Sequence, residues 1–581
     1  MRSTIKIVIL LFFICTSMSG ASFPDMEKYM RQHALIWEQL PMQWNEGAFL
    51  GNGLVGMMVY ADSTLNALVF HLGRPDVTDH RKAPYRKTSI GTEEADKMVD
   101  FCRLDVGKML LFPEGKILSG TFYLDIYNAE LTGHLKTDKG DLTFHAYTPQ
   151  PEEVNIVEVS SGVPYRWKGI PGNPCSPRIR VFPHLKEKLK YKDNPAPVVN
   201  QKDKEGSWVQ SLLAGGDYAT YWKEVPGGKS RSVLYVSTAN EVPASSLSLA
   251  KAMKTVEATQ ITGTKLLKQK TRQWWNAYHE RSFLSIPDKK LENFYFIQMY
   301  KLATCSHPDG PAMDVMGTFF KLSPWPSFWW NLNIQLTYMP IGPANRMEQG
   351  KNFQRLMDEV FPSLVRSIEP CKIGDYTWAL QNYYMYLRYA GADWQDIKQQ
   401  VVPKALDAFA VFDKILCYKE NTWHLTHIES PEYEGFQKYN DSNYGLASLS
   451  WLLQTLIACH DRTSSTHPDY ARWKEILTRL APYPTNENGL MIAANKPLEK
   501  SHRHYSHLLA FYPFRLLHPD VPENRKFLEK SIEHWLSLED GKGLAGYSYT
   551  GAASLYAYLG NGNKAYERLA HFINKPIGIS I

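Results

Sequence analysis

Two asparagines, Asn331 and Asn333, lie two residues apart in an aromatic run, WWNLNIQLTYMP, that spans residues 329–340. On a helix, positions i and i+2 point apart, whereas on an extended segment they share one side. An extended segment would therefore present two side-chain amides together, which suits the binding of one water molecule or one polar ligand. The alternative is a pair of turn asparagines that bond their own backbone.

Glu432, within the sequence HIESPEYEGF, is a second residue that could do chemistry. Pro431 disfavours helical geometry at Ser430, so we expect the carboxyl group to be presented from a turn. Neighbouring aromatic side chains would exclude water and favour the protonated carboxyl group, as a general acid requires. The alternative is an ordinary helix start, with Ser430 as the cap and Pro431 in the first turn.

The run HRHYSH begins with His502, Arg503 and His504. On an extended segment the two histidines would share one side, and neutral imidazoles and a guanidinium can hydrogen-bond sugar hydroxyls. One alternative is a zinc site, although no acid or thiol nearby in the sequence supplies a fourth ligand. Another is a pair of structural histidines bonded to loop carbonyls. We expect no metal and no cofactor.

The composition narrows the class of protein. A chain of 581 residues is long enough for two or three domains. The net charge of +6 is small for this length, and no cluster of Lys and Arg stands out, which argues against a nucleic-acid partner. Aromatic residues reach 13%, and their rings can pack against the C–H faces of sugars as well as build cores.

The N-terminus has the three parts of a secretory signal peptide. Arg2 and Lys6 form a basic start, residues 7–15 are apolar, and residues 19–21 are small. This pattern predicts a signal peptide over residues 1–21. Because no later stretch is apolar enough to span a membrane, we expect an exported protein in the periplasm or outside the cell. Six scattered cysteines remain, which allow one or two disulfides.

The elements that must position these residues fall into three regions. Residues 22–245 contain short alternating runs separated by turn residues, which predicts a large antiparallel β-sandwich. Within them, the glycine-rich stretch at 50–57 lacks the Lys-Ser/Thr of a phosphate loop and predicts a β-turn. Residues 246–285 indicate a helical linker. Residues 286–581 carry apolar residues at helical spacing, which favours paired helices closing into an (α/α)6 barrel.

One helix of the third region is especially clear. Leu446, Leu449, Leu453 and Leu456 form an apolar stripe, and Asp441-Ser442 precedes it as the expected cap.

These motifs, in this order, resemble glycoside hydrolase family 95, the inverting α-L-fucosidases and their α-L-galactosidase relatives. The N-terminal counterpart is LPMQWNEGAFLGNGLVGMMVY. The barrel counterparts are NLNIQLTYMP, Ser430-Pro431-Glu432, HRHYSHLLAFYP and GYSYTGAASLYAYLGNGNKAYERL. The resemblance covers nearly all of the chain after residue 21.

The resemblance implies an exported hydrolase that removes terminal α-L-fucosyl or related L-sugar residues from oligosaccharides or polysaccharides with inversion. Glu432 would protonate the leaving oxygen, and Asn331 and Asn333 would hold the attacking water through their carbonyl oxygens. The sugar subsite would be lined by His502, Arg503, His504, Trp330 and Trp378.

The sequence also departs from the family pattern. The aspartate that serves as the family's general base has no counterpart before Ile581, so we expect the base, the last barrel helices and a C-terminal β domain to be missing from these residues. Gln381 and Asn382 stand where the family has a histidine. The alternatives are therefore a truncated or degenerate member that binds glycans without turnover and, less favoured, a metal-dependent hydrolase.

Overall fold

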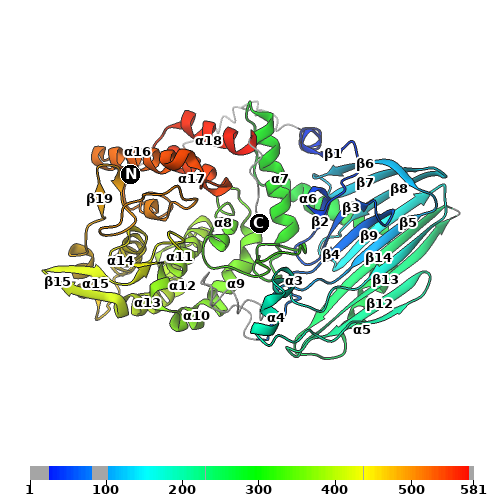
Figure 1. Cartoon of the computed structure of the whole chain (residues 1–581), viewed down its shortest axis with the longest axis horizontal. Coiled ribbons are helices and arrows are strands. Elements are labelled where there is room, and N and C mark those ends of the chain that lie inside the picture. Colours follow the sequence, from blue (N-terminus) through cyan, green and yellow to red (C-terminus); the bar gives the residue numbers. More distant parts are fainter. Residues whose placement is uncertain (1–24, 82–101, 229, 436, 575–581) are drawn as a thin grey trace, which may run out of the picture.

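The computed structural model describes residues 25–81, 102–228, 230–435 and 437–574. The predicted signal peptide at residues 1–21 lies outside these ranges. The long strands gather at one end of the molecule and most helices at the other, with helix α7 (Lys289–Cys305) between them (Figure 1). A large antiparallel β region followed by a helical region confirms the predicted fold class.

Two antiparallel sheets make up the β region. The larger sheet has nine strands in the order β1 (Leu35–Trp37), β6 (Ile117–Asp125), β7 (Glu130–Thr137), β8 (Gly140–Tyr147), β9 (Val154–Ser161), β14 (Arg231–Glu241), β13 (Asp217–Gly228), β12 (Glu205–Ser211) and β11 (Val198–Gln201). The smaller sheet has five strands in the order β10 (Tyr165–Ile170), β5 (Lys108–Pro113), β4 (Ala67–Gly73), β3 (Gly56–Asp62) and β2 (Ala48–Gly51).

Strand β7 shows why these residues form a sandwich. Leu131 and Leu135 are buried, whereas Thr132, His134 and Lys136 between and after them are exposed. Because successive side chains of a strand point to opposite faces, one face of this strand packs into the core and the other meets solvent. The alternation in the sequence thus reflects a sheet that is covered on one side.

The glycine-rich stretch at 50–57 forms the hairpin between β2 and β3, in which Gly51 pairs with Gly56. The Asn52 Oδ1 atom accepts hydrogen bonds from the backbone N–H groups of Leu54 and Val55, each at 3.0 Å. The predicted β-turn is therefore confirmed, and Asn52 stabilises it with its side chain.

The predicted linker forms two helices that pack on the β region. Helix α5 (Ser248–Thr262) and helix α6 (Thr264–His279) are separated by Gly263, whose φ is +78°. Helix α5 lies against β13 and β14, and Trp275 of α6 is fully buried in the core of the sandwich. Short helices α1 (Met26–Met30), α3 (Pro177–Val181) and α4 (His184–Lys188) complete this end of the molecule.

After α7, the helical region consists of α8 (Asn333–Tyr338), α9 (Lys351–Glu359), α10 (Phe361–Ser367), α11 (Ile373–Tyr389), α12 (Trp394–Gln400), α13 (Val402–Phe412), α14 (Asn443–Thr463), α15 (Tyr470–Thr478), α16 (Pro522–Ser537), α17 (Gly546–Tyr558) and α18 (Gly562–Asn574). Three short strand pairs, which the sequence did not indicate, lie between them: β15 (Leu416–Lys419) with β16 (Thr422–Leu425), β17 (Ile428–Glu429) with β18 (Lys438–Tyr439), and β19 (Thr485–Asn486) with β20 (Gly489–Leu490).

Helices α11 and α14 are central to this region. Every residue of α11 from 373 to 383 is buried, as is every residue of α14 from 443 to 453. By contrast, α16 buries only one stripe. A helix buried on all sides belongs to the interior, so amphipathic helices surround an inner pair. The predicted stripe of α14 is buried, and Ser442 caps the helix by accepting a hydrogen bond from the Gly445 N–H group.

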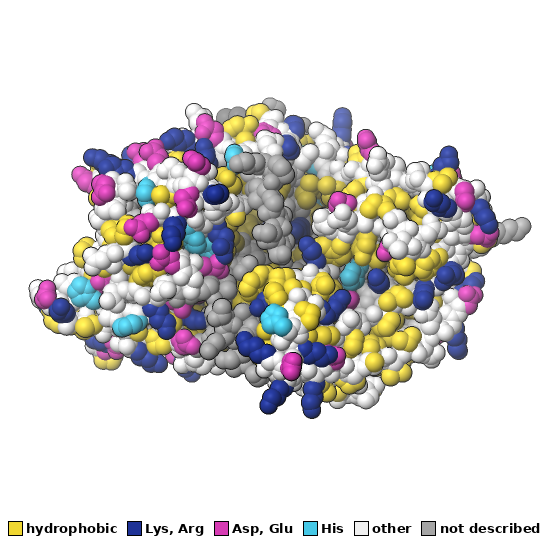
Figure 2. Space-filling view, in the orientation of Figure 1, with side chains coloured by type: hydrophobic (Ala, Val, Ile, Leu, Met, Phe, Trp, Pro, Cys, Tyr) yellow, Lys and Arg dark blue, Asp and Glu magenta, His cyan; other side chains and the backbone are white. Residues whose placement is uncertain are grey.

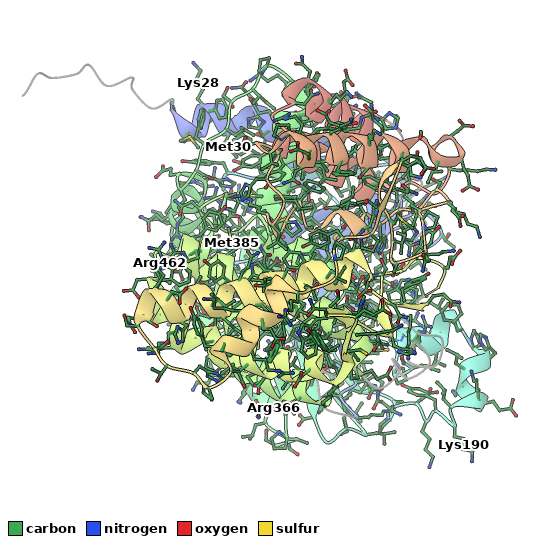
Figure 3. All side chains as sticks on the ribbon, turned by 90° about the vertical axis from the view of Figure 1, so that its left-hand side faces the viewer. Lys28, Met30, Lys190, Arg366, Met385 and Arg462 are labelled. Carbon is green, nitrogen blue, oxygen red and sulfur yellow. The ribbon has the colours of Figure 1, made fainter. Side chains whose placement is uncertain are left out.

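Charged side chains of both signs are interspersed on the helical part of the surface in Figure 2. Arg366 and Arg462 project from this part of the molecule in Figure 3, and Arg366 is paired with Asp407. Among the described residues, no helix is long and apolar enough to cross a membrane.

Candidate active site

Glu432 lies in a turn that directly follows strand β17. The Tyr433 N–H group donates to the Ser430 carbonyl at 3.0 Å, and residues 431–435 form turns rather than a helix. The structure therefore agrees with presentation from a turn and excludes the alternative of a helix start. The Glu432 side chain is 11% exposed, so its carboxyl group is sheltered but can still be reached from solvent.

The segment with His502, Arg503 and His504 packs against this turn. The hydroxyl groups of Ser430 and Ser506 lie 3.0 Å apart and connect the two segments. A hydrogen bond also holds the backbone of the histidine run, because the Trp535 indole donates to the His502 carbonyl at 2.7 Å. Two segments about 70 residues apart in the sequence are thus held together at one site.

The side chains of this run converge on Glu432. The Arg503 guanidinium forms an ion pair with the Glu432 carboxylate, and the His504 Nε2 atom lies 3.6 Å from Glu432 Oε2. The rings of His502 and His504 lie 5.2 Å apart, consistent with the expectation that they share one side. Burial lowers the pKa of His504 well below its usual value, so its imidazole is neutral near pH 7 and can both donate and accept a hydrogen bond.

Asn331 is buried at the start of the helical region and does not bond its own backbone. Its Nδ2 atom donates to Asp375 Oδ1 at 2.7 Å. Its Oδ1 atom is buried and has no hydrogen-bond partner among the described residues. A buried carbonyl left without a protein partner costs about 1–3 kcal/mol, so this oxygen is a place where a water molecule or a ligand can bind.

Asn333 does not accompany Asn331, because the segment is not extended. The Asn333 N–H group donates to the Asn331 carbonyl at 2.7 Å, and Leu332 between them has φ +64° and ψ −55°. These values define a γ-turn that is rare and strained for a residue with a side chain. Asn333 then begins helix α8 and is exposed. The predicted shared side of the two amides was wrong.

Both tryptophans assigned to the sugar subsite lie in the core. Trp330 is fully buried, with its ring stacked on Tyr376 at 5.1 Å between centroids, and Trp378 is 3% exposed within α11. Neither ring offers a free face on which a sugar could stack. The structure therefore places them as packing residues of the inner helices, which corrects the expectation.

Two buried carboxyl groups that the sequence did not single out are Asp375, which contacts Asn331, and Glu429, whose pKa Asp375 affects. Asp375, in the first turn of α11, accepts hydrogen bonds from Asn331 and from the Tyr444 hydroxyl at 2.6 Å, and burial raises its pKa. Glu429, at the end of β17, is also buried, and burial raises its pKa to about 7, with a further rise from nearby Asp375 and an opposing effect of Lys372. No motif in the sequence marks either acid.

The described residues contain no group of three His, Cys, Asp or Glu side chains that could hold a metal ion. Within the same described residues, Cys175, Cys305, Cys371, Cys417 and Cys459 form no disulfide. In the histidine run, His504 lies beside the Glu432 carboxylate together with Arg503.

The solved structures that match this chain share little sequence with it. A protein described as a kojibiose phosphorylase from the human microbiome has a TM-score of 0.60 at 9% identity, over 90% of this chain and 80% of that one. A bacterial glucoamylase complexed with acarbose has a TM-score of 0.49 at 10% identity, over 93% and 92%. A family GH92 α-mannosidase from Bacteroides thetaiotaomicron has 0.38 at 8%, over 90% and 78%. A search of curated proteins finds no match.

A family model supports a glycoside hydrolase. Residues 370–579 match the model of the glycosyl hydrolase family 95 catalytic domain. This segment contains Glu432 and the whole histidine run, so the family resemblance seen in the sequence is confirmed there. Asn331 and Asn333 precede the matched segment.

Proposed function

We propose that this protein is an exported exo-acting hydrolase that removes terminal α-L-fucosyl or related L-sugar residues from oligosaccharides or polysaccharides with inversion. The observation that carries this proposal is the sheltered carboxyl group of Glu432, held against Arg503 and His504 within the segment that matches family 95. The signal-peptide pattern of residues 1–21 supports export.

Each residue has a role in the proposed reaction. Glu432 donates its proton to the leaving glycosidic oxygen as the bond to the anomeric carbon breaks. His502, Arg503 and His504 hydrogen-bond the hydroxyl groups of the sugar. Asn331 holds the attacking water through its unpartnered Oδ1 atom. An amide oxygen orients a water but is a poor base, so a carboxylate must take the proton.

The ion pair of Arg503 with Glu432 favours a second candidate function, the binding of glycans without turnover. A neighbouring guanidinium stabilises the ionised form of a carboxyl group, whereas a general acid must carry a proton before it reacts. In an active enzyme, Arg503 must therefore turn from Glu432 to the sugar when substrate binds. Its side chain is half exposed, which leaves it room to do so.

The first test is the release and configuration of the product. Oligosaccharides ending in an α-L-fucosyl or α-L-galactosyl residue are incubated with the full chain, and the free sugar is followed by proton NMR before its anomers equilibrate. The proposal predicts that the β anomer appears first, because inversion changes the configuration. Initial release of the α anomer would contradict inversion. Saturable glycan binding by calorimetry with no released sugar would establish the second candidate.

A further inference from the structure

The orientation of the Asn331 side-chain amide is decided by its neighbour Asp375. An ionised carboxylate only accepts hydrogen bonds. The amide group must therefore turn its Nδ2 atom toward Asp375 Oδ1, 2.7 Å away. The opposite orientation would bring two oxygens together and lose this bond. Consequently the Asn331 Oδ1 atom points away from Asp375, where it has no partner among the described residues.

We propose that Asp375 is a positioning residue, which fixes the Asn331 amide so that its Oδ1 atom accepts a proton of the attacking water. This inference rests on the proposed function, in which Asn331 holds that water. Asp375 does not touch the substrate and acts through Asn331 alone.

Two contacts hold Asp375 in place for this role. The Tyr444 hydroxyl of α14 donates to Asp375 Oδ1 at 2.6 Å. The Gln335 side chain of α8 donates to the backbone carbonyl of Asp375 at 2.9 Å and to that of Trp330. Two hydrogen bonds thus attach the segment that carries Asn331 to the first turn of α11. One comes from the Asn331 side chain and the other from the Gln335 side chain.

The position of Asp375 in the fold also favours its ionised form. The N–H groups at the start of α11 give this end of the helix a partial positive charge, which stabilises a carboxylate in the first turn. Lys372 precedes the helix and acts in the same direction, against the effect of burial. Burial still raises the pKa of Asp375, but both the Asn331 amide and the Tyr444 hydroxyl donate to its Oδ1 atom, so this oxygen acts as an acceptor.

A double-mutant cycle tests whether Asp375 acts through Asn331. Asp375→Asn keeps the size of the side chain but lets either end of the Asn331 amide face it. We expect kcat to fall by about 10-fold or more with KM unchanged within about 3-fold, since only the water is misplaced. In an Asn331→Ala background, Asp375→Asn should lower kcat by less than about 2-fold.

Tyr383→Phe is the matched control, because it removes a hydrogen bond of the same kind, from the Tyr383 hydroxyl of α11 to Asp358 at 2.6 Å, and leaves Asn331 and Asp375 untouched. Its kcat should stay within about 3-fold of wild type, and thermal unfolding shows whether each variant is folded. If Asp375→Asn lowers kcat by the same factor with and without Asn331, Asp375 is only a structural residue and the proposal is wrong.

A crystal structure provides a readout that does not depend on turnover. In the wild-type protein we expect an ordered water within hydrogen-bond distance of Asn331 Oδ1, and in Asp375→Asn we expect this water to be lost or displaced. The same water in both structures, or an Oδ1 atom bonded to a protein group in wild type, would overturn the proposal. If the wild-type chain releases no sugar, the proposed function fails, while the water still decides the role of Asp375.

Discussion

At the scale of single residues, the buried carboxyl group of Glu429 makes the stability of the protein depend on pH. Burial raises its pKa from 4.5 to about 7 in the folded state, whereas the unfolded chain keeps the ordinary value. The folded state therefore binds this proton more tightly. Its contribution to stability is fully present below about pH 4.5 and is lost as the pH rises through about 7.

Glu429→Gln should remove this dependence. The free energy of unfolding of wild type, minus that of the variant, should decrease by about 3 kcal/mol between pH 4.5 and 7, because one pKa unit corresponds to about 1.4 kcal/mol. Urea unfolding at a series of pH values measures this difference, and titrations common to both proteins cancel. A difference that does not change with pH would show that Glu429 is ionised in the folded protein as it is in the unfolded chain.

The residues of the candidate site were predictable where a local motif presents them. Glu432 was expected on a turn because Pro431 restricts Ser430, and it lies on one. The interaction of Asn331 with Asp375 was not predictable, since 44 residues separate the two and neither has a local signature. Trp330 and Trp378 were misjudged because aromatic residues serve both cores and sugar sites, and only burial distinguishes the two.

At the scale of elements, the β2–β3 hairpin docks directly on the end of helix α7. The Gly53 N–H group donates to the Thr304 carbonyl at 3.0 Å. Gly53 has φ +82°, and a Cβ atom there would lie 2.3 Å from the Ser306 carbonyl carbon. The turn thus needs glycine both for its backbone conformation and for its close contact with the neighbouring chain.

Gly53→Ala should therefore destabilise the protein by more than its backbone conformation alone would cost. Gly560→Ala is the matched control, because Gly560 also has a positive φ, +75°, but no atom lies within 4 Å of its added Cβ. We expect the free energy of unfolding to fall by about 1–3 kcal/mol more for Gly53→Ala, the usual range for overpacking. Equal losses in both variants, measured by urea unfolding, would show that the hairpin does not dock closely.

The elements themselves followed from the sequence where periodicity was strong. The stripe of α14 and its Ser442 cap were predicted because apolar spacing and capping chemistry agree. The segment around Asn331 was predicted to be extended, and this was wrong, because the strained γ-turn at Leu332 is imposed by packing and has no propensity signal. The strand pairs between the helices are two to four residues long, too short to show an alternation.

At the scale of the whole molecule, the two regions form a continuous structure. The core of the sandwich includes Phe296 and Tyr300 of α7, and the Tyr300 hydroxyl donates to the Phe49 carbonyl at 3.1 Å. Buried Arg103 of the β region forms an ion pair with Asp314 of the helical region at 3.1 Å. The β region thus supports α7 and the loop that follows, which leads to Asn331.

The division into a β region and a helical region was predictable because it depends on patterns over hundreds of residues, which single errors do not change. The site was less predictable because Glu432 contacts Arg503 and His504, about 70 residues further along the chain, and Asn331 bonds Asp375, 44 residues away. Its assembly is a property of the tertiary structure, which local patterns do not encode.

The central claim is that Glu432 is the general acid. The most direct test is whether the loss of kcat in Glu432→Gln depends on the leaving group of the substrate. Glu432→Gln cannot donate a proton. We expect it to lower kcat by about 10²–10⁴-fold on an oligosaccharide substrate. On a dinitrophenyl α-L-fucoside, whose leaving group needs no proton, the loss should be at least about 10-fold smaller.

Glu434→Gln is the matched control, since Glu434 lies in the same turn but is exposed and pairs with Lys496. Its kcat should stay within about 3-fold of wild type on both substrates. The account predicts a large loss for Glu432→Gln on the oligosaccharide and a much smaller one on the activated substrate. An equal loss on both, or a loss no larger than that of Glu434→Gln, would contradict it.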